Sequence, residues 1–262
     1  MPSTALVAPP SALSYARGAR DVPLLDETIG ARLRTTAERF GDRDALVVRH
    51  QDYRATYAEL WHQVDRAARA LLAHGVEQGD RIAIWAPNRY EWVVTQFATA
   101  RVGAILVTVN PAYQARELAH ALTKAGASLL VMARGFRDAD YVAMLHDVRA
   151  DCPALRAAIV LEDDWEAFIG AGDEVTDAAL ARREASLRPG DAINIQYTSG
   201  TTGFPKGATL SHRNILNNAY FTARTLAYTE RDRACVPVPF YHTFGMVLGN
   251  LAGAVGLSLI HI

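Results

Sequence analysis

The residues of this chain that are best suited to chemistry lie in one segment rich in hydroxyl groups and glycine. Residues 197 to 207 read Tyr-Thr-Ser-Gly-Thr-Thr-Gly-Phe-Pro-Lys-Gly. Hydroxyl groups and backbone N–H groups can surround an anion there, because glycine has no Cβ to block the approach. Lys206 adds a full positive charge. The composition therefore predicts a loop that binds a polyphosphate.

A strand is expected before this loop and a helix after it. Residues 192 to 197 alternate apolar and polar side chains and include two isoleucines, which is typical of a strand that enters a core. Ser211 is a suitable N-cap for a helix over residues 212 to 226. A loop between a strand and a helix is the setting in which α/β proteins bind nucleotides. We therefore expect the ligand to be a nucleotide.

The spacing separates this loop from two other phosphate-binding patterns. Two residues lie between Gly200 and Gly203, and Lys206 precedes Gly207, so the segment is neither a Walker loop nor a GxGxxG fingerprint. Together with the residues that follow, up to His212, it resembles without gaps the phosphate-loop signature of the adenylate-forming enzymes. These include acyl-CoA synthetases, peptide-synthetase adenylation domains and beetle luciferases. The alternative for any cluster of Gly, Ser and Thr is a solvated turn.

The resemblance extends over residues 21 to 256, through Trp85-Ala-Pro-Asn88, Gly103-Ala-Ile105, Val109-Asn-Pro111 and Pro239-Phe-Tyr-His242. It implies the acyl-CoA synthetase branch, with ATP, Mg²⁺ and coenzyme A as cofactors and co-substrates. In that reaction a carboxylate attacks the α-phosphate of ATP to give an acyl-adenylate and pyrophosphate, and a thiol then displaces AMP. An aryl-acid or amino-acid activating enzyme, or a short protein that binds nucleotide or acyl groups without catalysis, are the alternatives.

The resemblance also implies which residues of the loop contact ATP. The residues expected to hold the β- and γ-phosphates are Thr198, Ser199, Gly200, Thr201, Thr202, Gly203 and Lys206. Their N–H, O–H and ammonium groups would stabilise the charge that builds on the departing pyrophosphate, and Mg²⁺ would neutralise the remainder. No metal-binding residue is assigned. The alternative for Lys206 is a solvated surface lysine.

A second informative stretch runs from residue 237 to residue 247 and resembles the acyl-pocket motif of the same family. By that resemblance His242 gates the passage between the nucleotide and the acyl chain, and Phe244 and Gly245 belong to the pocket. The apolar character of the motif favours a fatty acid of medium or long chain. A histidine beside aromatic residues can equally be a hydrogen-bonded core residue.

The bulk properties narrow the class of protein. The chain has 262 residues, of which 50% are hydrophobic and 21% charged, and its net charge of −1 gives no electrostatic reason to expect a nucleic-acid partner. Cys152 and Cys235 are too few for a disulfide framework, so a reducing cytoplasmic location fits. Residues 244 to 262 are apolar over a spanning length, but glycines and the lack of charged flanks argue against a transmembrane segment. The oligomeric state is not predicted.

Short apolar strands alternate with amphipathic segments along the chain. Helices are expected over residues 24–40, 56–75, 88–102, 115–125, 139–150 and within 163–188, and strands over residues 45–49, 53–56, 81–86, 103–108, 128–132 and 157–161. This alternation predicts an α/β fold with doubly wound, mostly parallel sheets. The resemblance implies the large domain of the adenylate-forming enzymes, truncated.

The expected domain organisation follows from the same resemblance. Residues 1–20 are expected to be a flexible arm, 21–190 a first α/β subdomain, and 191–256 the phosphate loop with the start of a second subdomain. Complete members of the family are roughly twice as long. The small C-terminal domain, which carries the family's catalytic lysine, is therefore expected to be absent, and the isolated chain is expected to be inactive.

Residues 257–262 read Leu-Ser-Leu-Ile-His-Ile, which equals the translation of a transposon-end adapter used in preparing sequencing libraries. We therefore hypothesise that these residues are a non-native tail and that the natural chain continues differently past Gly256. Finding the same six residues in an intact genome would remove this hypothesis.

Overall fold

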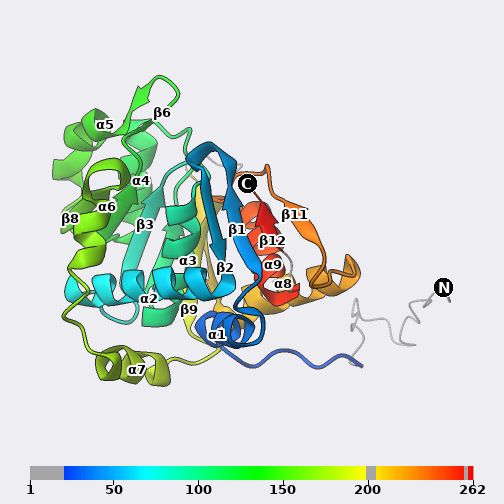
Figure 1. The fold of residues 1–262 in the computed structure, drawn as a ribbon. Helices are drawn as coiled ribbons and strands as arrows, with labels where there is room; N and C mark the ends of the chain where they lie inside the picture. Colours follow the sequence, from blue (N-terminus) through cyan, green and yellow to red (C-terminus); the bar gives the residue numbers. More distant parts are fainter. Residues whose placement is uncertain (1–20, 199–204, 257–258, 262) are drawn as a thin grey trace, which may run out of the picture.

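The structure is a computed structural model that describes residues 21–198, 205–256 and 259–261. These residues form two larger sheets and a short hairpin, connected by helices (Figure 1). The first sheet consists, in spatial order, of β10 (Lys206–Ser211), β9 (Ala192–Thr198), β4 (Ile105–Thr108), β3 (Arg81–Trp85), β5 (Leu129–Met132) and β8 (Ala157–Val160). The second consists of β11 (Arg233–Cys235), β12 (Leu259–His261), β1 (Asp44–Val48) and β2 (Tyr53–Thr56). The hairpin is made of β6 (Gly135–Phe136) and β7 (Ala139–Asp140).

Five strands of the first sheet, from β9 to β8, run parallel, and only β10 is antiparallel to its neighbour. The central strands β3 and β5 are buried along almost their whole length. A parallel sheet covered on both faces needs such continuous apolar strands, because neither face meets water. The expected α/β fold with a mostly parallel sheet is confirmed.

Helices cover both faces of this sheet. The helices before and between its strands are α1 (Ile29–Phe40), α2 (Tyr57–Ala73), α3 (Tyr90–Val102), α4 (Ala115–Ala125), α5 (Tyr141–Val148), α6 (Leu161–Gly170) and α7 (Asp177–Ser186). Crossovers between parallel strands are right-handed. From β3 the chain moves across the sheet to β4 in one direction, and from β4 it moves to β5 in the opposite direction. The connecting helices α3 and α4 therefore lie on opposite faces of the sheet. Figure 1 shows α2 and α3 in front of the strands. α4 packs with α5 on the other face.

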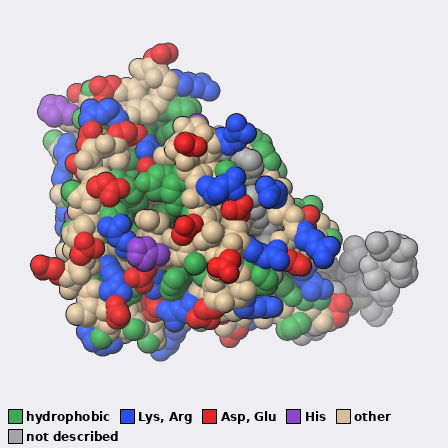
Figure 2. Space-filling model, viewed as in Figure 1, with side chains coloured by type: hydrophobic (Ala, Val, Ile, Leu, Met, Phe, Trp, Pro, Cys, Tyr) green, Lys and Arg blue, Asp and Glu red, His purple; other side chains and the backbone are tan. Residues whose placement is uncertain are grey.

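The last part of the chain packs between the two sheets. It contains α8 (His212–Thr225), the π-helix η3 (Phe244–Leu251) and α9 (Ala252–Gly256), and α8 contacts both η3 and α9. Two short 3-10 helices, η1 (Arg49–Gln51) and η2 (Arg149–Asp151), complete the described elements. Among the described residues, no helix is both long enough and apolar enough to cross a membrane. Figure 2 shows acidic and basic side chains interspersed over one face of the molecule.

Local sequence signals explain several element boundaries. Thr56 and Glu59 form the capping box that begins α2, with the Thr56 side chain accepting from the backbone N–H of Glu59. Gly103 and Gly126 end α3 and α4 in the left-handed conformation, with φ of 73° and 63°. The hairpin expected from residues 45 to 56 is present as β1 and β2. The hairpin and the expected helix ends at residues 102 and 125 are confirmed. The strand expected over residues 103–108 begins only at Ile105, because Gly103 is the C-cap of α3.

Other expected boundaries were wrong. The first helix begins at Ile29 and not at residue 24, because Thr28 is its N-cap and accepts from the N–H of Ala31 at 3.2 Å. α3 begins at Tyr90, and Asn88 is not its cap. The helix expected from residue 139 begins at Tyr141, because the preceding residues pair in the β6–β7 hairpin.

Segments far apart in the sequence lie side by side in both larger sheets. β1 pairs in parallel with β12 (Figure 1), and β9 pairs in parallel with β4. Each larger sheet takes strands from both sides of residue 190. The expected division of the chain into two subdomains at that residue stays a prediction. The backbone of residues 259–261 forms β12, and the proposed non-native origin of residues 257–262 also stays a prediction. The expected arm, residues 1–20, lies outside the described residues.

Candidate active site

The expected phosphate loop joins the two strands of a hairpin. β9 and β10 pair antiparallel, and Thr198 and Lys206 are partners where the loop begins and ends. The Thr198 Oγ1 donates a hydrogen bond to the backbone carbonyl of Lys206 at 3.3 Å. Both residues are exposed, so their side chains are accessible to a ligand. The remaining expected phosphate contacts, Ser199, Gly200, Thr201, Thr202 and Gly203, lie outside the described residues.

The hairpin corrects one expectation about the setting of the loop. A strand, β10, separates the loop from α8, so the order is strand, loop, strand, helix. Lys206 is the first residue of β10 and not part of a flexible turn. Gly207 follows it where an added Cβ would lie 3.0 Å from the Ile195 side chain and 3.5 Å from the Tyr197 ring. The missing side chain therefore lets β10 lie close to β9 next to Lys206.

Three polar side chains fix β9 in place. The Asn194 amide donates to the carbonyl of Leu106 at 2.8 Å, and the Tyr197 hydroxyl donates to the carbonyl of Ala121 at 2.8 Å. Burial raises the pKa of Tyr197 to about 12, so this hydroxyl keeps its proton. The Gln196 amide donates to the Met246 sulfur at 3.7 Å. β9 is thereby joined to β4, to α4 and to η3.

The helix after the hairpin begins as expected. Ser211 is the N-cap of α8 and accepts from the N–H of Asn214 at 3.2 Å. His212 is fully buried, and its Nδ1 accepts from the backbone N–H of Ile29 at 3.2 Å. Burial lowers the pKa of His212 to about 4, so the ring is neutral near pH 7. The structure thus gives His212 a structural contact with α1.

Asn88 holds the segment that carries the expected acyl-pocket motif. Its Nδ2 donates to the carbonyl of Val238 at 2.9 Å, and its Oδ1 accepts from the N–H of Phe240 at 2.8 Å. Phe240 is buried, with its ring centroid 5.4 Å from that of Trp92. A side chain that bonds the backbone twice fixes both position and orientation. The motif is therefore attached to the end of β3.

The three residues expected to form the acyl gate differ in their surroundings. His242 is exposed, and its Nδ1 accepts from the N–H of Phe244 at 3.2 Å. Phe244 is 55% exposed and lines the apolar cavity described next. Gly245 is buried against the turn before it, where an added Cβ would lie 2.5 Å from the carbonyl oxygen of Pro239. Within the described residues, the walls of that cavity include Phe244 but neither His242 nor Gly245.

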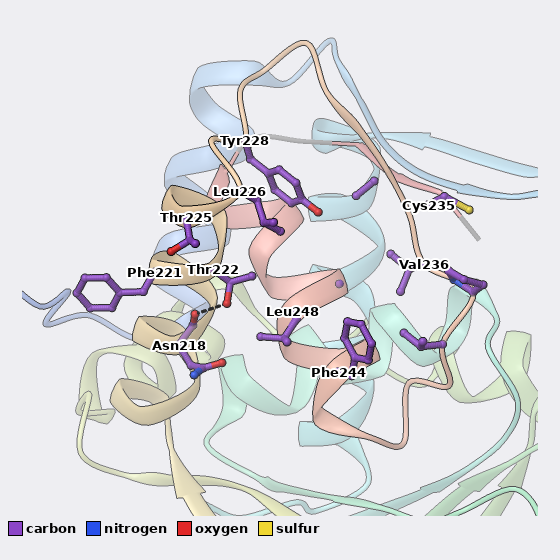
Figure 3. Close-up of a pocket in the computed structure, with 14 residues that line it drawn as sticks. Asn218, Phe221, Thr222, Thr225, Leu226, Tyr228, Cys235, Val236, Phe244 and Leu248 are labelled. Carbon is purple, nitrogen blue, oxygen red and sulfur yellow. Dashed lines mark hydrogen bonds between the residues drawn. The ribbon is translucent and has the colours of Figure 1, made fainter. Parts of the chain in front are cut away.

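An apolar cavity lies between α8, β11 and η3 (Figure 3). Its volume is about 560 Å³. The residues that line it are Asn218, Phe221, Thr222, Thr225, Leu226, Tyr228, Ala234, Cys235, Val236, Pro237, Val238, Phe244, Leu248 and Gly249. Ligand cavities typically span roughly 300 to 1,000 Å³ and are mostly apolar with a few polar groups. This cavity fits that description and lies directly beside the helix that follows the phosphate-loop hairpin.

A second cavity of about 620 Å³ lies where β3 and β4 end. Pro87 and Asn88 follow β3, and Asn110 and Pro111 follow β4. The two cavities share the lining residues at positions 235 to 237, so one stretch of chain separates them. In open parallel sheets, ligands bind outside the carboxyl ends of the strands, where the strand order reverses.

The described residues do not fit a metal ion held by the protein alone. In this part of the chain, no three His, Cys, Asp or Glu side chains are grouped so that they could hold a metal. Mg²⁺ in nucleotide sites is bound by one or two carboxylates together with substrate phosphates. No step of the chemistry is therefore assigned to Mg²⁺ through these residues.

The sequence did not predict the buried polar contacts that position η3. The Gln96 amide on α3 donates to the carbonyl of Met246 at 3.3 Å and accepts from the amide of Asn250 at 3.0 Å. Both side chains are at least 96% buried. An amide residue inside an otherwise apolar stretch could have indicated these contacts, because a buried amide side chain requires hydrogen-bond partners. Only the structure identifies those partners.

Comparisons with known proteins identify the family to which this chain belongs. The sequence profile of the AMP-binding enzyme family matches residues 33–260. The protein named medium-chain acyl-CoA ligase ACSF2, mitochondrial, of Danio rerio is 41% identical over 266 residues, which cover 92% of this chain and 43% of the relative. Among solved structures, Mycobacterium smegmatis MbtA has a TM-score of 0.79 at 27% identity, over 91% of this chain and 44% of that one. The anthranilate CoA ligase AuaEII has a TM-score of 0.80 at 21% identity, over 92% and 46%.

The chain belongs to the AMP-binding enzyme family. Its curated relatives include proteins named acyl-CoA ligases, so the expected resemblance is confirmed. The chain spans less than half the length of these relatives. The match to AuaEII, at 21% identity, concerns the fold alone.

Proposed function

We propose that this chain is the amino-terminal part of an ATP-dependent acyl-CoA ligase that adenylates a fatty acid and transfers the acyl group to coenzyme A. The observation that carries this proposal is the position of α8. This helix begins directly after the β9–β10 hairpin and forms one wall of the apolar cavity. A single rigid element therefore connects the site for the ATP phosphates with the site for the acid.

On the nucleotide side, we propose that the loop binds the β- and γ-phosphates. Thr198 and Lys206 lie side by side at the base of the loop and are both exposed. When the carboxylate attacks the α-phosphate, negative charge moves onto the departing pyrophosphate, and the Lys206 ammonium stabilises it, joined by the Thr198 hydroxyl once that group turns from the Lys206 carbonyl to the phosphate. Mg²⁺, when bound with ATP, would neutralise part of the same charge. Ser199, Gly200, Thr201, Thr202 and Gly203 complete the proposed contacts.

On the acid side, we propose that the apolar cavity takes the acyl chain. Among the described residues, the large apolar side chains that are exposed are Leu24, Val142, Phe221, Leu226 and Phe244, and the last three line this cavity. Exposed apolar side chains gathered in one hollow are typical of a ligand site. The relative named as a medium-chain ligase supports a fatty acid of that class. His242 remains the proposed gate, since it precedes Phe244 by two residues.

The isolated chain is proposed to be inactive in the complete reaction. It covers 43% of the length of the Danio rerio relative. We propose that the catalytic lysine and the ribose and metal ligands belong to the remainder of that length. The free thiol of Cys235 is exposed, which suits the reducing cytoplasm that we propose as the location.

Amine labelling tests the proposed phosphate site directly, because Lys124 and Lys206 are the two lysines of the sequence. The chain is treated with an amine-acetylating reagent with and without MgATP, and the acetylation of each lysine is measured by peptide mass spectrometry. We expect MgATP to reduce the labelling of Lys206 several-fold. Lys124, which is exposed on α4, is the internal control and should label equally in both samples.

AMP and inorganic tripolyphosphate are matched ligands for this experiment. Tripolyphosphate should protect Lys206 and AMP should not, because AMP lacks the β- and γ-phosphates. If neither MgATP nor tripolyphosphate reduces the labelling of Lys206, the proposed site is contradicted. Pyrophosphate exchange by the complete enzyme across fatty, aryl and amino acids then separates the ligase proposal from its alternatives.

A further inference from the structure

Tyr228 enters the apolar cavity from the segment that follows α8. The residue is half-buried and is one of the cavity's lining residues. Figure 3 shows its ring directed into the cavity from the end of α8, while Phe244 on η3 lies toward the other end of the view. Phe244 lies two residues after the proposed gate, His242. The ring of Tyr228 is therefore placed where an acyl chain that enters past Phe244 would end.

The backbone on one side of Tyr228 is fixed by the end of α8. The N–H of Tyr228 donates to the carbonyl of Ala223 at 2.9 Å, and the N–H of Ala227 donates to the carbonyl of Arg224 at 3.1 Å. These two bonds form a Schellman motif, in which the residue before the last donor is left-handed. Ala227 takes that position with φ of 53°. An alanine held in this unfavourable region indicates that the surroundings determine the turn.

The backbone on the other side is fixed by a second turn. The N–H and the hydroxyl of Thr229 both donate to Asp232 Oδ2, at 2.7 and 2.8 Å. These bonds lower the pKa of Asp232, so the carboxylate remains charged and the turn persists near pH 7. Tyr228 is thus held between two closed turns. These bonds hold the backbone of Tyr228, and its partly buried ring packs against the hydrophobic core.

We propose that Tyr228 determines the maximum acyl-chain length that the cavity accepts. This inference rests on the proposed function, in which the cavity holds the acyl chain. A bulky ring packed against the core at the end of an apolar cavity stops a longer chain, because extra methylene groups would have to displace it. Tyr228 is accordingly a specificity-determining residue and takes no part in the reaction itself.

Direct binding of fatty acids to the chain tests this proposal. Saturated fatty acids of increasing length are titrated into the chain by calorimetry. Affinity should rise about fourfold for each added CH₂, because each buried CH₂ contributes a constant increment, until the chain reaches Tyr228. Beyond that length the affinity should stop rising. This break in the series is the predicted signature of the wall.

Variants of Tyr228 should move the break in opposite directions. Tyr228→Ala should extend the rising part of the series, so that an acid two carbons beyond the wild-type limit gains roughly tenfold in affinity. Tyr228→Trp should shorten it, and Tyr228→Phe should leave it unchanged. Tyr220→Ala is the control, since Tyr220 lies on α8 with its ring 5.5 Å from that of Phe221 and is not among the residues that line the cavity.

The outcomes separate this inference from the proposed function. If the wild-type chain binds fatty acids with a break, and the break stays at the same length in both Tyr228→Ala and Tyr228→Trp, the assignment of Tyr228 is wrong while the acyl cavity stands. If the wild-type chain binds no fatty acid of any length, the acyl cavity itself is wrong. A cooperative thermal transition of each variant, with unchanged helix content by far-ultraviolet circular dichroism, establishes that the comparison is made between folded proteins.

Discussion

Two polar side chains determine where the segments of the proposed site lie. Asn88 bonds the backbone of the motif between β11 and η3 at two points, and His212 bonds the first turn of α1 from the start of α8. Each connects parts of the chain that are at least 150 residues apart. Their roles are positional, since neither is placed in contact with a substrate.

The contact of Asn88 makes a testable prediction for stability. Asn88→Ala leaves the carbonyl of Val238 and the N–H of Phe240 without their side-chain partner. Unsatisfied buried polar groups are costly, so we expect the free energy of unfolding to fall by about 2 kcal/mol. Urea denaturation measures this difference. Asn218→Ala is the control, because Asn218 is exposed and a surface change should stay within about 0.5 kcal/mol; an equal, small effect of both changes would contradict the role of Asn88.

The burial of His212 predicts a pH dependence of stability. Burial lowers its pKa in the folded chain to about 4, from an ordinary value of 6.5, and the charge of Asp191 opposes this in part. Between these two pH values the unfolded chain binds a proton that the folded chain does not, so stability is complete above about pH 6.5 and falls as the pH decreases toward 4. The gap corresponds to about 3 kcal/mol at most.

Denaturation across this pH range tests that sign. His212→Asn retains an acceptor for the N–H of Ile29 but does not titrate, so the loss of stability between about pH 6.5 and 4 should be smaller in the variant. His146→Asn is the control, because His146 is 90% exposed on α5 and should leave the pH profile unchanged. A variant His212→Asn with the same pH profile as the wild type would show that His212 remains protonated or is accessible in the folded chain.

Elements whose signals are local were predictable from the sequence. The capping box at Thr56 and Gly126 at the end of α4 act within a few residues, so the predicted boundaries there agree with the structure. β10 was not expected as a strand, because its residues pair only with β9 and have no strong alternation of their own. Asn88 was expected to begin a helix, but its tertiary bonds to the later segment prevailed over that local preference.

The proposed site was predictable to a similar degree. The sequence singled out the proposed phosphate loop and the apolar motif, which the structure connects through α8 and η3, and their binding roles stay predictions. The sequence could not identify which side chains line the cavity, because those residues come from three separate elements. Tyr228 and Cys235 belong to the cavity only through the way β11 and the end of α8 pack.

The π-helix η3 requires a glycine at its beginning. An added Cβ at Gly245 would lie 2.5 Å from the carbonyl oxygen of Pro239, which is backbone and cannot move away easily. We therefore expect Gly245→Ala to lower the free energy of unfolding by about 1–3 kcal/mol, as overpacking does in other proteins. Gly190→Ala is the control, since nothing lies within 4 Å of a Cβ at that position. Equal stability of the two variants in urea denaturation would contradict this packing.

At the scale of the whole molecule, both larger sheets are assembled from distant parts of the chain. β9 extends the sheet that begins with β3, and β11 and β12 extend the sheet that begins with β1. The proposed phosphate loop therefore leaves a sheet whose central strands β4, β3 and β5 are buried, which holds its base in place. Such a rigid support is what a site needs to stabilise charge in a transition state.

The most direct test of the central claim is acid-dependent exchange of pyrophosphate into ATP by the complete enzyme that contains this chain. Lys206→Ala should lower the exchange rate about a hundredfold, because one charged contact to the departing pyrophosphate is lost. Lys124→Ala, on α4, should exchange at the wild-type rate. If the Lys206→Ala enzyme exchanges pyrophosphate as fast as the Lys124→Ala enzyme, the loop does not bind the phosphates of ATP, and the proposed nucleotide site is contradicted.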